Sequence, residues 1–186
     1  MSGAAMADPR ITRLDAAGFE ARLDALAEIL HATVADGASV GFVEPFTRED
    51  SRAFWRDGVG PALRRGTRVL LIAETGGALT GTVQLDLDMM PNQAHRGVVA
   101  KLLVHPEHRR RGIARALMRA IEGEAWARGR SLVTLDTRTG DDAEPLYRAL
   151  GYQAAGTIPG FALAPGRDRL DPTTYMYKML ASADSI

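Results

Sequence analysis

Three consecutive arginines, Arg109 to Arg111, stand directly before Gly112 in the segment HPEHRRRGIARALM (residues 105–118). An apolar run precedes this segment, and a pattern typical of an amphipathic helix follows Gly112. Where a strand passes through a tight loop into a helix, the first helical turn presents unpaired backbone N–H groups and the positive end of the helix dipole. A bound anion satisfies both. The spacing Arg109-x-x-Gly112-x-Ala114 therefore indicates a phosphate-binding loop.

The small residues of this loop support the same interpretation. Gly112 lets a phosphate approach the backbone without meeting a β-carbon, and Ala114 is nearly as small. The pattern lacks the Gly-Lys-Ser/Thr of a nucleotide-binding P-loop and the three glycines of a dinucleotide fingerprint. The alternative is a solvated arginine cluster, which a chain with 21 arginines and two lysines among its 23 basic residues readily produces.

The overall composition excludes several classes of function. The 186 residues carry 23 basic and 23 acidic side chains, so no net charge favours a nucleic acid or a membrane surface. The chain has no cysteine, and its four histidines show no metal-ligand spacing, so we expect no metal site. No apolar stretch is long enough for a membrane span, and no basic-then-apolar leader opens the chain. These features predict a cytoplasmic protein.

The hydrophobic patterns predict the elements that must position this loop. Helices are expected at residues 18–35, from Thr47 with fraying at 58–61, at 113–128 and at 143–150. Strands are expected at residues 11–15, 68–74, 80–87, 97–104, 132–137 and from 152 through the alternating run 174–180, with a hairpin turn at 75–77. This order predicts a single α/β domain with a mixed sheet and helices on its faces.

Three segments in order resemble the core of the GCN5-related N-acetyltransferase (GNAT) superfamily. They are KLLVHPEHRRRGIARALM (101–118), LVTLDT (132–137) and AEPLYRALGY (143–152). The signature of that superfamily is Arg/Gln-x-x-Gly-x-Gly/Ala, and the resemblance covers about residues 68–180. It implies one acetyltransferase domain over residues 1–186 with the GNAT fold, a mixed, mostly antiparallel sheet of six to seven strands flanked by helices.

Shorter segments resemble the tabtoxin-resistance type of acetyltransferase within this superfamily. They are GASVGF (37–42), VQL (83–85), PN (91–92), LDT (135–137) and PGF (159–161). That type carries a glutamate on the strand before the arginine loop, whereas this chain reads Gly97-Val-Val-Ala100 there. The departure puts in doubt both a base made of two carboxylates and an identical substrate.

The resemblance assigns the arginine loop to the pyrophosphate of acetyl-coenzyme A, with no metal. The residues implied in coenzyme binding are Leu102, Leu103, Val104, Arg109, Arg110, Arg111, Gly112, Ile113, Ala114 and Arg115. The strand over residues 101–104 would be splayed from its neighbour, so that its free backbone groups bind the amides of the pantetheine arm. A backbone N–H near Leu102 or Leu103 would polarise the thioester carbonyl.

Two side chains are the candidate catalytic groups. Tyr147 occupies the place where these enzymes often carry the tyrosine that protonates the coenzyme sulfur, and an ordinary tyrosine pKa near 10 keeps it protonated at neutral pH. Packing on an apolar helix face is the alternative. Asp136 interrupts an apolar run at the end of a strand, where ligands gather in open α/β sheets. It could bind the substrate ammonium group or relay its proton, and capping the following turn is the alternative.

Polar side chains supply the candidate substrate contacts. Val83 and Leu85 share one face of their strand, which places Gln84 and Asp86 on the other face. We expect Gln84, Asp86 and Glu44 to contact the substrate, with Glu44, Asp86 and Asp136 framing a negatively charged entrance that suits a small cation. Solvated strand positions would explain Gln84 and Asp86 as well.

These observations predict an N-acetyltransferase that moves the acetyl group of acetyl-coenzyme A directly to a primary amine of a small molecule, an amino-acid-like toxin or antibiotic among them. The alternatives are acetylation of a protein N-terminus or lysine, and a catalytically silent acyl-coenzyme A-binding module. A nucleic-acid partner is disfavoured because the arginines form one loop without interleaved aromatic residues. We expect no membrane association, and either a monomer or a homodimer.

Overall fold

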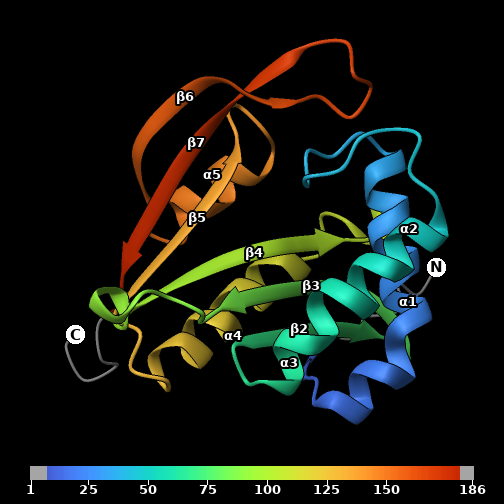
Figure 1. Ribbon diagram of the computed structural model, residues 1–186, viewed down its shortest axis with the longest axis horizontal. Helices are drawn as coiled ribbons and strands as arrows, with labels where there is room; N and C mark the ends of the chain where they lie inside the picture. Colours follow the sequence, from blue (N-terminus) through green and yellow to red (C-terminus); the bar gives the residue numbers. More distant parts are fainter. Residues whose placement is uncertain (1–7, 181–186) are drawn as a thin grey trace, which may run out of the picture.

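Seven strands form one sheet in the order β1-β2-β3-β4-β5-β7-β6 (Figure 1). The computed structural model describes residues 8–180. The strands are β1 (Arg10–Arg13), β2 (Arg68–Thr75), β3 (Ala78–Asp86), β4 (Arg96–Val104), β5 (Leu132–Arg138), β6 (Gln153–Leu163) and β7 (Leu170–Met179). All neighbours pair antiparallel except β4 and β5, which are parallel. The predicted α/β class, with a mostly antiparallel sheet of six to seven strands, is confirmed.

Helices cover both faces of this sheet (Figure 1). One face carries α1 (Ala16–Ala35), α2 (Arg48–Ala53) and α3 (Gly60–Arg64), and the other carries α4 (Ile113–Trp126) and α5 (Ala143–Ala149). Short 3-10 turns lie at Pro91–Gln93 and Pro106–His108. Within residues 8–180, no helix combines the length and the apolar character that a membrane span requires.

The first helix begins at a side-chain cap and buries one apolar stripe. Asp15 accepts a hydrogen bond from the Gly18 N–H at 2.7 Å, which satisfies one of the free donors of the first turn. Phe19, Leu26 and Leu30 are almost fully buried and pack in one cluster with alternate residues of β2. This helix ends at Ala35, directly before the loop over residues 37–42.

The fraying predicted at residues 58–61 is wrong. A capping box between Thr47 and Asp50 opens the helix as expected, and the chain stays helical to Arg64 through a π-helical turn at Phe54–Val59. The Gly60 N–H donates to the Trp55 carbonyl, which is the π spacing. Pro61 then stands in the first turn of α3, directly after the π-helical turn.

The helix α4 lies very close to β3 at Gly81. A β-carbon built at Gly81 would stand 2.8 Å from Ile113 Cγ2, 2.9 Å from Leu117 Cδ1 and 3.1 Å from the Leu103 carbonyl oxygen. Real β-carbons need more room, so only glycine lets α4 lie at this distance from the sheet. Since Ile113 is the first residue of α4, this contact also fixes where the helix begins.

Gly81→Ala is therefore expected to lower the free energy of unfolding by about 1–3 kcal/mol, because the added methyl group overpacks the contact between β3 and α4. Gly123→Ala is the matched control, since Gly123 is exposed within α4 and a β-carbon there meets no atom within 4 Å. The control should gain about 0.5–1 kcal/mol from helix propensity. Urea unfolding followed by circular dichroism measures both, and equal stabilities for the two variants would contradict the close packing.

Candidate active site

The site begins where β4 and β5 part. Only three residue pairs join the two strands, from Arg96 with Leu132 to Val98 with Thr134. Beyond these pairs the strands diverge (Figure 1). The edge of β4 that faces β5 therefore has no strand partner along residues 99–104, and its peptide groups need another partner.

A β-bulge in β4 lies at the same point. Thr82 of β3 pairs with Leu103 and Gln84 pairs with Ala100, so one residue of β3 faces two residues of β4, Lys101 and Leu102. Lys101 has a φ of 51°, in the left-handed region that a non-glycine residue rarely adopts. Such a bulge bends the strand, which turns β4 away from β5.

The alternation of the backbone decides which N–H groups face the gap. The His105 N–H donates to the Thr80 carbonyl on β3 at 3.0 Å. Successive N–H groups along a strand point to opposite sides, so those of Val104 and Leu102 point toward the gap. Of the two N–H groups predicted to lie near the reacting carbonyl, this geometry favours that of Leu102 over that of Leu103.

The arginine loop forms the second part of the site. Gly112 is the residue before α4 and has a φ of 78°, which favours glycine. No side chain caps α4, and its first intrahelical bond runs from the Ala116 N–H to the Gly112 carbonyl. The N–H groups of Ile113, Ala114 and Arg115 therefore have no helical partner, which is the geometry that an anion site requires.

The arginines of the loop have different surroundings. Arg109 forms an ion pair with Asp36 at 2.5 Å, at the end of α1. Arg110 lines the pocket beside it. The guanidinium group of Arg111 lies 3.3 Å from His108 Nδ1, and Arg111 does not line the pocket. The loop thus offers two of its three arginines to a ligand between β4 and β5.

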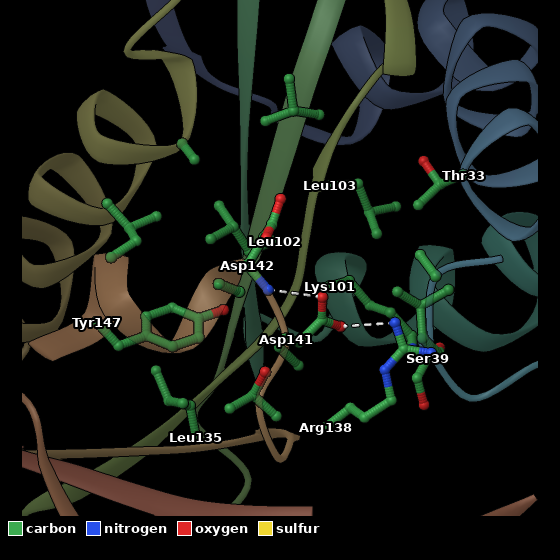
Figure 2. Close-up of a pocket in the computed structure, with 18 of the residues that line it drawn as sticks. Thr33, Ser39, Lys101, Leu102, Leu103, Leu135, Arg138, Asp141, Asp142 and Tyr147 are labelled. Carbon is green, nitrogen blue, oxygen red and sulfur yellow. Dashed lines mark hydrogen bonds and ion pairs between the residues drawn. The ribbon is translucent and has the colours of Figure 1, made fainter. Parts of the chain in front are cut away.

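One pocket of about 730 Å³ joins these parts (Figure 2). Its walls are residues 99–104 of β4, the start of α4, the end of β5 with the following loop, Tyr147 on α5, the 36–41 segment after α1, and Phe161 and Ala162 of β6. The predicted residues that it brings together are Leu102, Leu103, Val104, Arg109, Arg110, Gly112, Ile113, Ala114, Arg115, Asp136 and Tyr147.

Tyr147 faces this pocket from α5, with its hydroxyl group pointing inward (Figure 2). Only 7% of the residue is exposed, and its ring packs edge-on against Tyr152. Burial raises the pKa of the Tyr147 phenol above its ordinary value, and the nearby Asp141 and Asp136 carboxylates raise it further. Within residues 8–180 the hydroxyl makes no hydrogen bond, so it stays protonated and available to a ligand.

Asp136 lies on the end of β5 and is exposed in the pocket. Among the described residues it forms no ion pair and accepts no hydrogen bond, so the alternative that it caps the following turn has no support. That turn is held instead by Arg138, which forms an ion pair with Asp141 at 3.2 Å. Asp136 is therefore free to meet a cationic ligand.

The predicted substrate contacts lie outside this pocket. Gln84 is only 1% exposed, because helices cover the face of β3 that was expected to be solvated. It accepts a hydrogen bond from Arg68 at 3.1 Å, and Asp86 forms an ion pair with the same guanidinium group. Glu44 accepts from the Phe46 N–H at 3.0 Å. These three side chains have partners within the protein, which corrects the expectation that they contact the substrate; of the predicted entrance residues Glu44, Asp86 and Asp136, the pocket includes Asp136.

The pocket also contains residues that sequence reasoning missed. Residues 36–41 form one of its walls, and Lys101 and Arg138 lie in its lining. The GASVGF segment was noted only for its likeness to one enzyme type. The isolated lysine in an apolar strand was a usable signal, since a lysine between buried strand positions needs a specific partner.

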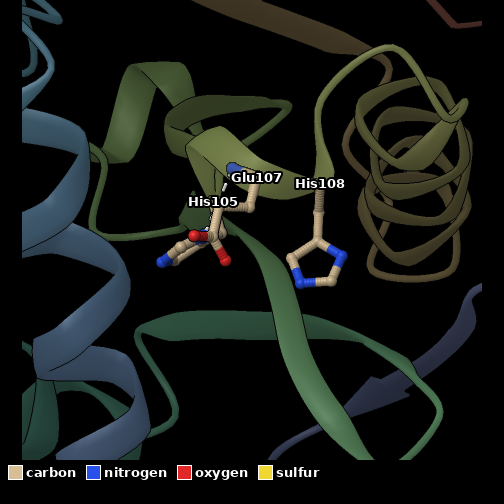
Figure 3. A group of neighbouring side chains, drawn as sticks. All are labelled: His105, Glu107 and His108. Atoms are coloured by element: carbon tan, nitrogen blue, oxygen red, sulfur yellow. Dashed lines mark hydrogen bonds between the residues drawn. The ribbon is translucent and has the colours of Figure 1, made fainter.

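A group of two histidines and one glutamate lies beside the arginine loop (Figure 3). The ligand atoms of His105, Glu107 and His108 lie within 4.8 Å of one another. His105 Nδ1 already accepts a hydrogen bond from the Glu107 N–H at 3.3 Å, and Arg111 lies against His108. A guanidinium group at this distance repels a divalent cation, so the group does not support a metal site.

Comparison with known proteins agrees with the acetyltransferase resemblance of the sequence. The model of the acetyltransferase (GNAT) family matches residues 27–152. Acetyltransferase YE1169 of Yersinia enterocolitica is 35% identical over 97 residues, which are 52% of this chain and 65% of that protein. The match thus spans less than two thirds of this relative.

Solved structures share the fold over nearly the whole chain. An N-acetyltransferase from Staphylococcus aureus Mu50 superposes with a TM-score of 0.77 at 17% identity, covering 94% of this chain and 100% of that one. The yncA protein of Salmonella typhimurium, whose structure holds its cofactor acetyl-CoA, has a TM-score of 0.75 at 19% identity, covering 97% and 100%. At these identities the similarity establishes the shared fold.

The raised pKa of Tyr147 leads to a prediction for the isolated protein. Since its phenol ionises above the ordinary range, wild type and Tyr147→Phe should release the same number of tyrosine protons up to about pH 11. Absorbance at 295 nm during an alkaline titration measures this number. A wild-type excess of one proton with a midpoint near pH 10 would contradict the buried environment of Tyr147.

Proposed function

Since the chain belongs to the acetyltransferase (GNAT) family, we propose that it transfers the acetyl group of acetyl-coenzyme A directly to a primary amine of a small molecule. The observation that carries the proposal is the single pocket that joins an anion-binding helix start, a free strand edge, the Tyr147 hydroxyl group and the Asp136 carboxylate. Binding, polarisation of a carbonyl and two proton transfers are what direct acyl transfer requires.

The described residues fit the coenzyme at its pyrophosphate and along its pantetheine arm to the thioester. The free N–H groups at the start of α4, with Arg109, Arg110 and Arg115, would hold the pyrophosphate. The N–H groups of Leu102 and Val104 would bind the pantetheine arm and the thioester end. Acetyl-coenzyme A, when bound there, supplies the acetyl thioester and the thiol leaving group.

Tyr147 is the proposed proton donor. Its hydroxyl group is buried at the pocket wall, and its raised pKa keeps the proton in place across the neutral range. The phenol would therefore be present in its O–H form and could donate a hydrogen bond to the departing thiolate, and it would give up its proton only as negative charge develops on the sulfur. The Leu102 N–H would stabilise the negative charge that develops on the carbonyl oxygen.

Asp136 is the proposed group on the amine side. Its exposed, unpaired carboxylate suits an ammonium group, and a water molecule between them would carry the amine proton away. We propose no second carboxylate from the predicted substrate contacts, because Asp86 and Glu44 have partners elsewhere.

One feature favours a small acceptor over a protein. The 36–41 segment and the β6 residues Phe161 and Ala162 both line the pocket, which bounds the space beside Asp136. The likeness to the tabtoxin-resistance type suggests an amino-acid-like acceptor, and acetylation of a protein N-terminus or lysine is the competing outcome.

A thiol-release assay tests the function. Purified protein with acetyl-coenzyme A should release coenzyme A thiol with at least one member of a panel of amino acids, polyamines, amino-acid-like antibiotics and lysine-containing peptides. Turnover with peptides only would replace the small-molecule acceptor by a protein. Tight coenzyme binding with no turnover for the whole panel would indicate a silent binding module.

Tyr147→Phe should lower kcat by about ten- to a thousandfold, the range for a positioned proton donor, while acetyl-coenzyme A still binds. Tyr152→Phe is the matched control, because Tyr152 is equally buried, contacts the Tyr147 ring and does not line the pocket. Steady-state rates between pH 6 and 9 with saturating coenzyme measure both. If the Tyr147→Phe enzyme keeps wild-type turnover where chemistry limits the rate, Tyr147 is a packing residue.

The anion site makes a separate prediction. Arg115→Glu should raise the Kd for acetyl-coenzyme A by about ten- to a hundredfold, because a favourable charge beside the pyrophosphate becomes a repulsive one. Arg119→Glu is the control, since Arg119 is exposed one turn later on α4 and does not line the pocket. Calorimetric titration compares the two. Equal weakening in both variants would show a general charge effect and remove Arg115 from the site.

A further inference from the structure

Lys101 is a partly buried cation that the proposed chemistry does not use. Its side chain leaves the β4 bulge and reaches the loop over residues 37–42, which follows α1. Lys101 Nζ donates a hydrogen bond to the Val40 carbonyl oxygen at 2.5 Å. It also lies 5.2 Å from the ring centre of Phe42 and 5.6 Å from that of Phe54.

This ammonium group is compensated without a carboxylate contact. Among the described residues, Lys101 forms no ion pair, so the Val40 carbonyl and the two aromatic faces are its close partners. Burial lowers the pKa of Lys101, the Asp136 carboxylate opposes that effect, and Arg68 adds to it. Removing an ammonium group from water without a carboxylate partner costs free energy. We therefore expect the contact between Lys101 and the 37–42 loop to have a functional role.

The loop is tied to the pocket at two further points. Asp36, directly before it, forms an ion pair with Arg109 of the arginine loop at 2.5 Å. The Gly37 carbonyl accepts a hydrogen bond from Arg138, at the end of β5, at 3.4 Å. Lys101 makes the third contact, which reaches the middle of the loop at Val40 and comes from β4. We call this contact the tether. Lys101 is also the residue with a left-handed φ in the bulge, directly before Leu102.

We propose that Lys101 is a positioning residue that holds the 37–42 loop against the β4 bulge, so that the acceptor wall of the pocket is fixed relative to the Leu102 N–H. The part of this proposal that concerns the acceptor rests on the proposed function. The tether itself does not, and it can be measured in the free protein.

Hydrogen exchange of the full-length protein tests the tether. In Lys101→Met, amides of residues 37–42 should exchange at least about fivefold faster than in wild type, because a cation that binds a carbonyl and two rings is replaced by an uncharged chain of similar length. Lys101→Arg, which keeps the cation, should restore most of the protection. Lys178→Met is the matched control, because Lys178 is the other lysine of the chain and pairs with Glu122 at 2.6 Å outside the pocket.

Kinetics with the fastest amine of the panel test the role of the tether. Lys101→Met should lower kcat/KM for the amine by at least about tenfold, with the Kd for acetyl-coenzyme A within about twofold of wild type, since the coenzyme contacts on β4 are main-chain groups. Lys101→Arg should recover most of the loss. A purely structural role would instead weaken coenzyme and amine together.

The outcomes separate this inference from the proposed function. Unchanged exchange of residues 37–42 in Lys101→Met, or faster exchange with unchanged amine kinetics, would overturn it. If Lys101→Met does not fold, Phe42→Leu removes one of the two rings and must reproduce the local increase in exchange. A wild-type protein that acetylates no amine of the panel would overturn the acceptor role along with the proposed function, while the exchange result would still decide whether the tether exists.

Discussion

Every part of the pocket depends on the point where β4 and β5 stop pairing. A parallel pair that continued to the ends of both strands would satisfy its own peptide groups and leave no space between them. Pairing ends after Val98 and Thr134, and the bulge at Lys101 turns β4 aside. Backbone N–H and C=O groups that would otherwise pair with a neighbouring strand are therefore free to form hydrogen bonds with a ligand that contains amide groups.

The helices on one face hold the two walls of this opening apart. The start of α4 is fixed on β3 by the glycine contact at Gly81. Tyr147 on α5 packs into the same apolar cluster as Ile113 and Leu117 of α4. The anion-binding end and the proposed proton donor thus belong to one packed core, which fixes their separation before any ligand arrives.

The features that could be predicted from the sequence are those that the local order of apolar, polar and glycine residues determines. The strand, loop and helix around Gly112 follow from side-chain periodicity and one glycine. Tyr147 and Asp136 lie in the pocket, and each belongs to an element that its pattern predicts. Gln84 was placed wrongly because strand alternation identifies two faces and cannot say that helices cover both. Asp86 was placed wrongly because the pattern does not show that Arg68 on the neighbouring strand pairs with it. The role of the 37–42 loop depends on contacts about 60 residues apart, from Val40 to Lys101, and no local pattern encodes such a pairing.

The scarcity of lysine has a consequence for the proposed reaction, which involves a reactive thioester. Arginine carries its charge without a nucleophilic amine, and 21 of the 23 basic residues are arginines. Both lysine amines are engaged, one with the Val40 carbonyl and the other with Glu122. Along residues 8–180, therefore, the chain presents no lysine amine without a hydrogen-bond partner to an acylating compound.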